Sequence, residues 1–135
     1  MTKILCVDDN DTNIYMLQAI LGRVGFRVLC AADGEEGVAM ARAERPDLIL
    51  MDLLLPGIDG LEAARRIKAS AETSAIPIIA LSAHEEREKG MLARAAGCDD
   101  YARKPLNVRM LLDKIHKLLG ACGARKGAPE AERGS

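Results

Sequence analysis

The chain has 135 residues, 49% of them hydrophobic, which excludes a disordered chain and is enough for one domain with a substantial core. Aromatic residues make up only 2%, so the core must be aliphatic. The formal net charge of −1 argues against binding nucleic acid through a basic surface. No apolar stretch approaches the roughly 20 residues that span a bilayer, and the N-terminus lacks a signal-peptide pattern.

Four cysteines are present, and they form neither a CxxC motif nor a zinc-type spacing. Three of them, Cys6, Cys30 and Cys98, lie in apolar, strand-like segments, and Cys122 lies near the C-terminus. We interpret the first three as small buried hydrophobic side chains without a metal or redox role. A reducing cytoplasm is the expected compartment, and we expect no contact with membranes.

Apolar, strand-like segments recur along the chain. They lie at 3–7, 26–31, 48–52, 76–81 and 98–102. A segment with helical spacing of apolar residues follows each of them. The first predicted helix begins at Asn10 or Asp11 and ends at Gly22 and Gly25. The others cover 35–44, 61–71, 85–96 and 106–119. Strict alternation of this kind predicts an α/β fold, a doubly wound sheet of five parallel strands with helices on both faces.

The C-terminal residues 121–135 have no apolar periodicity and no large apolar side chains. We therefore expect a folded domain over 1–120 and a flexible tail over 121–135.

Polar side chains end or follow four of the predicted strands. They are Asp8 and Asp9, Asp52, Ser82, and Lys104. The carboxyl ends of parallel strands share one edge of the sheet, which is where ligands bind in open α/β folds. Taken alone, Asp52 also suits a turn, and the acidic pair also suits a helix start. Their joint placement favours a ligand site.

Three converging carboxylates need positive charge nearby. Two unit charges about 4 Å apart repel by roughly 4 kcal/mol at an effective dielectric constant of about 20. Lys104 supplies one positive charge. A hard divalent cation such as Mg²⁺ would supply the rest, because it takes oxygen ligands from one or two carboxylates and from water.

With these pieces in order, residues 3–119 resemble the receiver domain of bacterial two-component response regulators. The matching pieces are Asp8-Asp9, the strand 48–52 with the loop 55–60, Ala80-Leu81-Ser82-Ala83, and Tyr101-Ala-Arg-Lys104-Pro105. The resemblance implies a flavodoxin-like (βα)5 sheet with strand order 2-1-3-4-5.

The resemblance also implies a phosphoacceptor and a metal. Asp52 would take a phosphoryl group from the phosphohistidine of a histidine kinase or a histidine phosphotransfer protein. Asp9, Asp52 and the backbone carbonyl of Leu54 would hold Mg²⁺ (or Mn²⁺), and Asp8 would hold it through water. The protein would then be no enzyme in the usual sense, since it would catalyse only its own phosphorylation and dephosphorylation.

Further roles follow from the same resemblance. Lys104 would pair with Asp52 and then with a phosphoryl oxygen, and its peptide bond to Pro105 would be cis. Ser82 would move to hydrogen-bond the phosphoryl group, and the small Ala83 would leave room for that movement.

The remaining implied roles concern the switch. Tyr101 matches the aromatic residue that turns inward when the hydroxyl residue moves. Leu53, Leu54 and His84 would border the phosphoryl group and tune its lifetime. The output face would comprise 85–96, 98–102 and 106–119. Contacts expected on it are Met91, Arg94, Arg103 and Arg109.

We therefore expect a stand-alone receiver, a monomer or weak dimer, that signals by binding a downstream protein. The run 9–13, Asp-Asn-Asp-Thr-Asn, resembles hybrid-kinase receivers and single-domain cell-cycle regulators of the DivK type. Two alternatives stay open. A degenerate receiver would only bind proteins. A haloacid-dehalogenase-type phosphatase would also use a strand-end Asp, but it needs a second Asp where this chain has Leu54.

Overall fold

The computed structural model describes residues 2–53, 55, 57–82, 94–103 and 107–126, with side chains up to residue 120. Five parallel strands form one sheet in the order β2-β1-β3-β4-β5. The strands are β1 (Lys3–Val7), β2 (Arg27–Ala31), β3 (Leu48–Asp52), β4 (Ile78–Ser82) and β5 (Asp100–Arg103). The helices are α1 (Asp11–Val24), α2 (Gly34–Glu44), α3 (Gly60–Ala69) and α5 (Val108–Lys126). The predicted fold class and strand order are confirmed.

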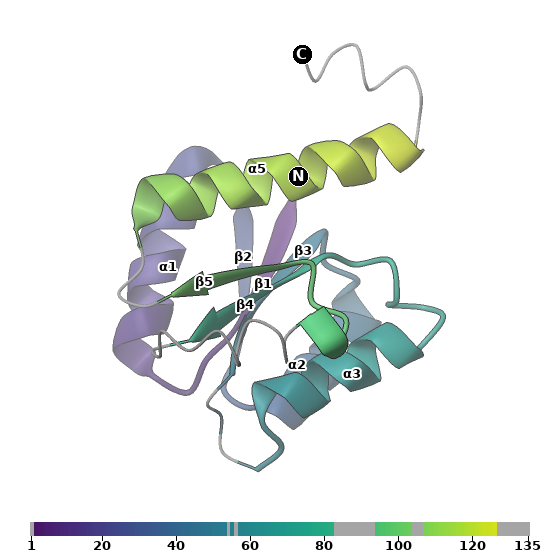
Figure 1. The fold of residues 1–135 in the computed structure, drawn as a ribbon. Coiled ribbons are helices and arrows are strands. Elements are labelled where there is room, and N and C mark those ends of the chain that lie inside the picture. Colours follow the sequence, from purple (N-terminus) through teal and green to yellow (C-terminus); the bar gives the residue numbers. More distant parts are fainter. Residues whose placement is uncertain (1, 54, 56, 83–93, 104–106, 127–135) are drawn as a thin grey trace.

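Helices cover both faces of the sheet (Figure 1). On one face, α1 and α5 bury leucines and isoleucines against alternate residues of β1, β3 and β4, among them Ile4 and Leu50. On the other face, α2 and α3 pack against the intervening residues, such as Val7 and Met51. All five residues of β3 are buried, as expected for the central strand of a covered parallel sheet.

Side-chain caps fix where three of the helices begin. Asn10, rather than Asp11, caps α1, and its side chain accepts a hydrogen bond from the N–H of Asn13 at 3.0 Å. Asp33 and Asp59 cap α2 and α3 in the same way. Such caps satisfy backbone donors that have no partner in the first turn. All three helices begin at the carboxyl edge of the sheet, so their caps surround that edge.

Several predicted boundaries were wrong. Strand β4 begins at Ile78 instead of residue 76, because Pro77 has no N–H to donate; the Pro77 carbonyl still accepts from Ile49 N–H at 2.9 Å. Strand β5 begins at Asp100 instead of residue 98, and helix α5 runs on to Lys126, past the predicted end at residue 119. The predicted helix 85–96 lies largely outside the described residues.

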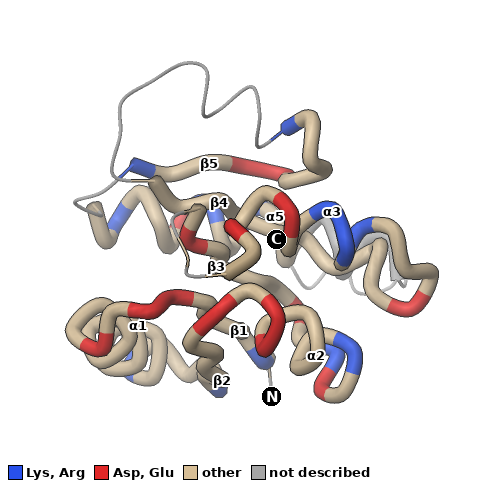
Figure 2. Tube along the Cα trace, turned by 90° about the horizontal axis from the view of Figure 1, so that it is seen from below, with Lys and Arg blue, Asp and Glu red and all other residues tan. Residues whose placement is uncertain are grey.

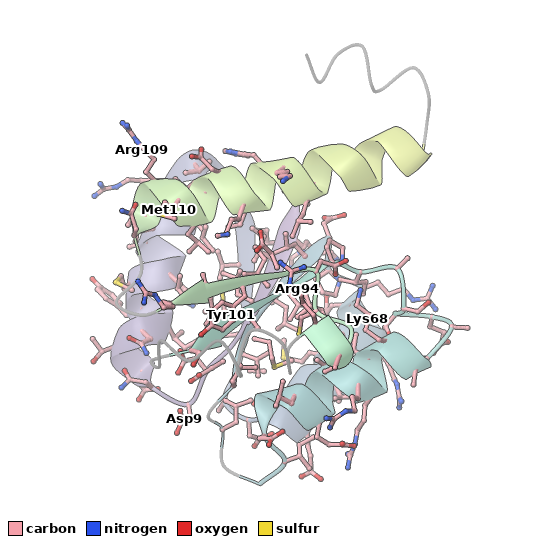
Figure 3. All side chains as sticks on the ribbon, viewed as in Figure 1. Asp9, Lys68, Arg94, Tyr101, Arg109 and Met110 are labelled. Carbon is pink, nitrogen blue, oxygen red and sulfur yellow. The ribbon has the colours of Figure 1, made fainter. Side chains whose placement is uncertain are left out.

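Lys68 connects the loop between α3 and β4 to the residue before β5. Its ammonium group donates to the carbonyls of Ile76 at 2.6 Å and Ser74 at 3.2 Å, and it pairs with Asp99 at 3.1 Å. Asp99 in turn accepts from Ile78 N–H at 2.9 Å, outside the strand ladder. This arrangement (Lys68 is labelled in Figure 3) explains why β5 starts only after Asp99.

The cysteines differ in their surroundings. Cys6 and Cys98 are buried as predicted, although Cys98 precedes β5 instead of lying in it. Burial raises the pKa of the Cys98 thiol to about 11, and nearby Asp99 adds to the rise. Cys30 was predicted to be buried but is half-buried, because β2 is an edge strand of the sheet. Its sulfur accepts a hydrogen bond from the Gln18 side-chain amide at 3.2 Å.

Within the described residues, none of the helices combines the length and the apolar character that crossing a membrane requires.

Candidate functional site

Three carboxylates meet at the carboxyl edge of the sheet. Oxygen atoms of Asp8, Asp9 and Asp52 all lie within 4.8 Å of one another. They converge because β1 and β3 are neighbours, with Val7 opposite Met51, so that both strands end side by side. Figure 2 shows acidic segments gathered around α1, β1 and β3. The convergence expected from the strand ends is therefore present in the fold.

The three carboxylates differ in exposure. Asp8 is 2% exposed and Asp52 is 5% exposed, whereas Asp9 is exposed to solvent. Burying a carboxylate is unfavourable unless hydrogen bonds or a cation stabilise it. Two buried carboxylates next to an exposed one make a site that is partly shielded and still open to solvent.

Asp8 is oriented by the start of α1. One of its carboxylate oxygens accepts from the Asn10 N–H at 2.9 Å, and the other accepts from the Asn13 side-chain amide at 3.3 Å. The Asp8 N–H donates to the Ala31 carbonyl on β2 at 3.0 Å. The sequence analysis used Asn13 only as a marker of subfamily, and it missed this positioning role.

Ser82 ends the neighbouring strand. It is 3% exposed and lies one residue beyond Leu81, which is the register partner of Asp52. The Leu53 N–H donates to the Leu81 carbonyl at 2.9 Å, which carries the pairing of β3 and β4 one residue past Asp52. The carboxylate and the hydroxyl residue are thus held on adjacent, rigid strand ends. The Leu53 side chain is itself buried.

Gly60 lies against the backbone of the residue after Asp52. A Cβ atom added at Gly60 would lie 2.7 Å from the Leu53 Cα and 2.9 Å from the Asp52 carbonyl carbon, closer than real Cβ contacts come. The Gly60 N–H also donates to the Leu53 carbonyl at 3.1 Å. The start of α3 therefore supports the end of β3 directly, a contact that the loop pattern around Gly60 did not reveal.

Replacing Gly60 with alanine should lower the free energy of unfolding by about 2 kcal/mol or more, because backbone must move to admit the methyl group. Gly22→Ala is the matched control. Gly22 lies within α1, a Cβ there meets nothing within 4 Å, and we expect a stabilisation of about 0.5–1 kcal/mol. Urea unfolding of both variants measures the effect. Equal changes in the two variants would contradict the close contact.

The predicted switch residue Tyr101 lies on β5. It is half-buried, it packs against the core cluster between the sheet and α2 and α3, and its register partner on β4 is Ala80. Figure 3 shows it on the same side of the molecule as Arg94. Arg109 and Met110 lie exposed at the beginning of α5.

Several predicted site residues lie outside the described residues. They are Leu54, Ala83, His84, Met91, Lys104 and Pro105. Their roles, including the cis peptide bond before Pro105, stay predictions.

Comparison with known protein families identifies the family of this chain. Residues 4–116 match the model of the response regulator receiver domain. The chain belongs to the response regulator receiver domain family. Receiver domains are signalling modules of two-component systems, so neither the carboxylates nor the fold indicates a classical enzyme.

Curated relatives include other receivers. The chain is 41% identical over 119 residues to protein PilH of Pseudomonas aeruginosa. The aligned region covers 88% of this chain and 98% of PilH. It is 33% identical over 118 residues to the polar-differentiation response regulator DivK of Brucella anthropi, covering 87% and 96% of the two chains. Longer relatives, among them transcriptional regulators and a sensor protein, are matched over 15% to 58% of their length.

Solved structures agree. The receiver domain of sensor histidine kinase PA1611 from Pseudomonas aeruginosa is 37% identical, with a TM-score of 0.82 and coverage of 88% of this chain and 98% of that one. That crystal structure has a magnesium ion coordinated in its active site cleft.

The carboxylates of this receiver suit a hard divalent cation. They offer oxygen atoms only, two of them buried and one facing water, and Mg²⁺ favours a few carboxylate oxygens completed by water. Within the described part of the chain, no other group of three His, Cys, Asp or Glu side chains could hold a metal.

Proposed function

We propose that Asp52 accepts a phosphoryl group from a histidine kinase or a histidine phosphotransfer protein, and that its phosphorylation changes which protein the domain binds. The observation that carries the proposal is the convergence of Asp8, Asp9 and Asp52 within 4.8 Å at the sheet edge of a receiver domain.

Mg²⁺ (or Mn²⁺) would be held by Asp9, Asp52 and the Leu54 carbonyl, with Asp8 acting through water. When bound, the cation offsets negative charge on the carboxylates and on the transferring phosphoryl group. The oxygen-only donor set supports this assignment, and so does the magnesium ion in the PA1611 receiver.

In the transfer itself, a carboxylate oxygen of Asp52 attacks the phosphorus atom of the partner's phosphohistidine. The new P–O bond forms as the P–N bond breaks, and the electron pair of the P–N bond returns to the histidine ring nitrogen. The chain contributes chiefly positioning, because a buried strand fixes Asp52 at the sheet edge. Lys104 would then pair with a phosphoryl oxygen.

The conformational change would begin at Ser82 and continue to β5. Ser82 would move to hydrogen-bond the phosphoryl group, with Ala83 leaving room, and Tyr101 would turn inward on the next strand. The half-buried position of Tyr101 supports this role, since its ring already packs partly against the core. Phosphorylation would act by shifting the population between two states.

The downstream protein would bind the face made of 85–96, β5 and α5. Arg94, Arg103 and Arg109 are proposed contacts on it, together with Met91. The phosphoryl lifetime would depend on Leu53, Leu54 and His84. We propose that residues 1–120 form the domain that carries this function.

Intact-mass measurement after treatment with acetyl phosphate tests the proposal. We expect the mass of one phosphoryl group to be added in the presence of Mg²⁺, and little or none with EDTA. Absence of acid-labile phosphate under both conditions would favour a degenerate receiver that only binds proteins. Release of many phosphates per chain from a small phosphomonoester would favour a phosphatase.

A further inference from the structure

Two cysteines that are far apart in the sequence are direct neighbours in the sheet. Cys6 on β1 and Cys30 on β2 are register partners in the parallel ladder. Register partners on neighbouring parallel strands point to the same face of the sheet. Both lie on the face covered by α1: Cys6 belongs to the core cluster that contains Leu17 and Leu21, and the Cys30 sulfur accepts a hydrogen bond from Gln18. The absence of a local cysteine motif had pointed away from any such pairing.

The strand spacing decides what this pair of thiols suits. Neighbouring strands lie about 4.8 Å apart, and the Cβ atoms of two residues in register are separated by about the same distance. A disulfide needs the two Cβ atoms about 3.8 Å apart, which would require the strands or side chains to converge. A metal ion bound linearly between two sulfurs needs them about 4.6 Å apart, twice a metal–thiolate bond of about 2.3 Å. The unstrained spacing therefore fits a bridging ion better than a disulfide.

Among the described residues, no third His, Cys, Asp or Glu side chain joins Cys6 and Cys30 in a group that could hold a metal. The one such group of three in the described part of the chain is Asp8, Asp9 and Asp52, and it contains neither cysteine. A tetrahedral zinc site would need four ligands. Soft cations that accept two thiolates in a line have no such requirement, and thiolate ligands select soft metals.

We propose that Cys6 and Cys30 form a cross-strand dithiol site for one soft, two-coordinate metal ion. Binding breaks both S–H bonds, forms two metal–sulfur bonds and releases two protons to the solvent. A divalent ion gives a neutral bis-thiolate complex, which suits a site that is buried on the Cys6 side and lies two residues from Asp8. Gln18 keeps its hydrogen bond to the Cys30 sulfur.

Entry runs through the edge of the sheet. Cys30 is half-buried on β2, which has a neighbouring strand on one side only (Figure 1), and four of the five residues of β2 are at least partly exposed. The ion meets Cys30 first and reaches the buried Cys6 when the edge strand opens locally. This site does not depend on phosphoryl transfer.

The test uses the full chain with Cys98→Ala and Cys122→Ala, so that only Cys6 and Cys30 keep their thiols. One equivalent of Hg(II) is added in the presence of excess 2-mercaptoethanol, and native mass spectrometry counts the ions retained. We expect one ion per chain, with two protons lost, and two sulfur neighbours by X-ray absorption. A chelating pair should hold the ion on the order of 100-fold more tightly than a single thiol does.

Two matched variants in the same background separate a pair from two single thiols. Cys30→Ser removes the exposed partner, and Leu29→Cys with Cys30→Ser keeps two thiols but moves one to the α2 and α3 side of the sheet, where Leu29 packs. Both should lose the ion to the monothiol while keeping a cooperative thermal transition. Equal retention in the variant with the moved thiol would overturn the proposal, and so would two ions bound per chain in the parent.

Discussion

Replacing Asp52 with asparagine should abolish phosphorylation, with the rate falling by at least about 1,000-fold. An amide has no anionic oxygen to attack phosphorus, so no acyl phosphate forms. The side chain keeps its shape, and it loses a charge that lies within 4.8 Å of two other carboxylates, so the variant should fold at least as stably as the wild type. Intact mass after treatment with acetyl phosphate and Mg²⁺ measures the loss.

Asp59→Asn is the matched control for this variant. Asp59 caps α3 and accepts from the Glu62 N–H at 2.9 Å, and asparagine caps helices equally well. Like Asp52→Asn, this variant replaces a carboxylate with an amide at the same edge of the sheet, but at a helix cap outside the acidic cluster. We therefore expect phosphorylation near the wild-type rate. A full phosphoryl gain in Asp52→Asn would remove Asp52 from its proposed role, because the group would then reside on another side chain.

The sequence alone predicts the part of the site that depends on which residues end the parallel strands. Asp8 follows one apolar strand and Asp52 ends another. Because parallel strands place their carboxyl ends at one edge, the meeting of these carboxylates could be predicted before the structure. The strand order itself came from the resemblance to receivers. Apolar runs such as 48–52 report burial on both faces, which is why β3 was predicted within its observed bounds.

What the sequence did not reveal depends on contacts between distant segments. Gly60 looks like an ordinary loop glycine until α3 is placed against the Asp52–Leu53 backbone. Lys68 looks like a surface lysine until its ammonium group is found between Ile76 and Asp99. Cys6 and Cys30 become neighbours only through the register of β1 and β2. No local pattern encodes these proximities, since each is set by how helices and strands pack.

Replacing Asp8 with asparagine should make the metal-free protein more stable. Folding brings the Asp8 and Asp52 carboxylates within 4.8 Å, where two unit charges repel by about 3.5 kcal/mol at an effective dielectric constant of about 20. The asparagine side chain would lose this repulsion, while its carbonyl oxygen would still accept from the Asn10 N–H. Its amide faces Asn13 less favourably, so we expect a net gain of about 1 kcal/mol and a rise in Tm of about 4 °C, measured with EDTA present.

The same substitution should weaken the response to Mg²⁺. A carboxylate that holds the cation through water typically contributes 10- to 100-fold to metal affinity, so Asp8→Asn should need about 10 times more Mg²⁺ for the same rise in Tm.

Asp11→Asn is the control, since Asp11 is an exposed acidic residue in the first turn of α1. It should lose about 0.3–1 kcal/mol of helix-dipole stabilisation and keep its Mg²⁺ response. Opposite signs in the metal-free proteins are the decisive result, because a stability gain in Asp8→Asn alone identifies repulsion within the acidic cluster as the larger effect at Asp8. A lower Tm for metal-free Asp8→Asn would contradict this account and would make the hydrogen bonds from Asn10 and Asn13 the dominant effect at Asp8.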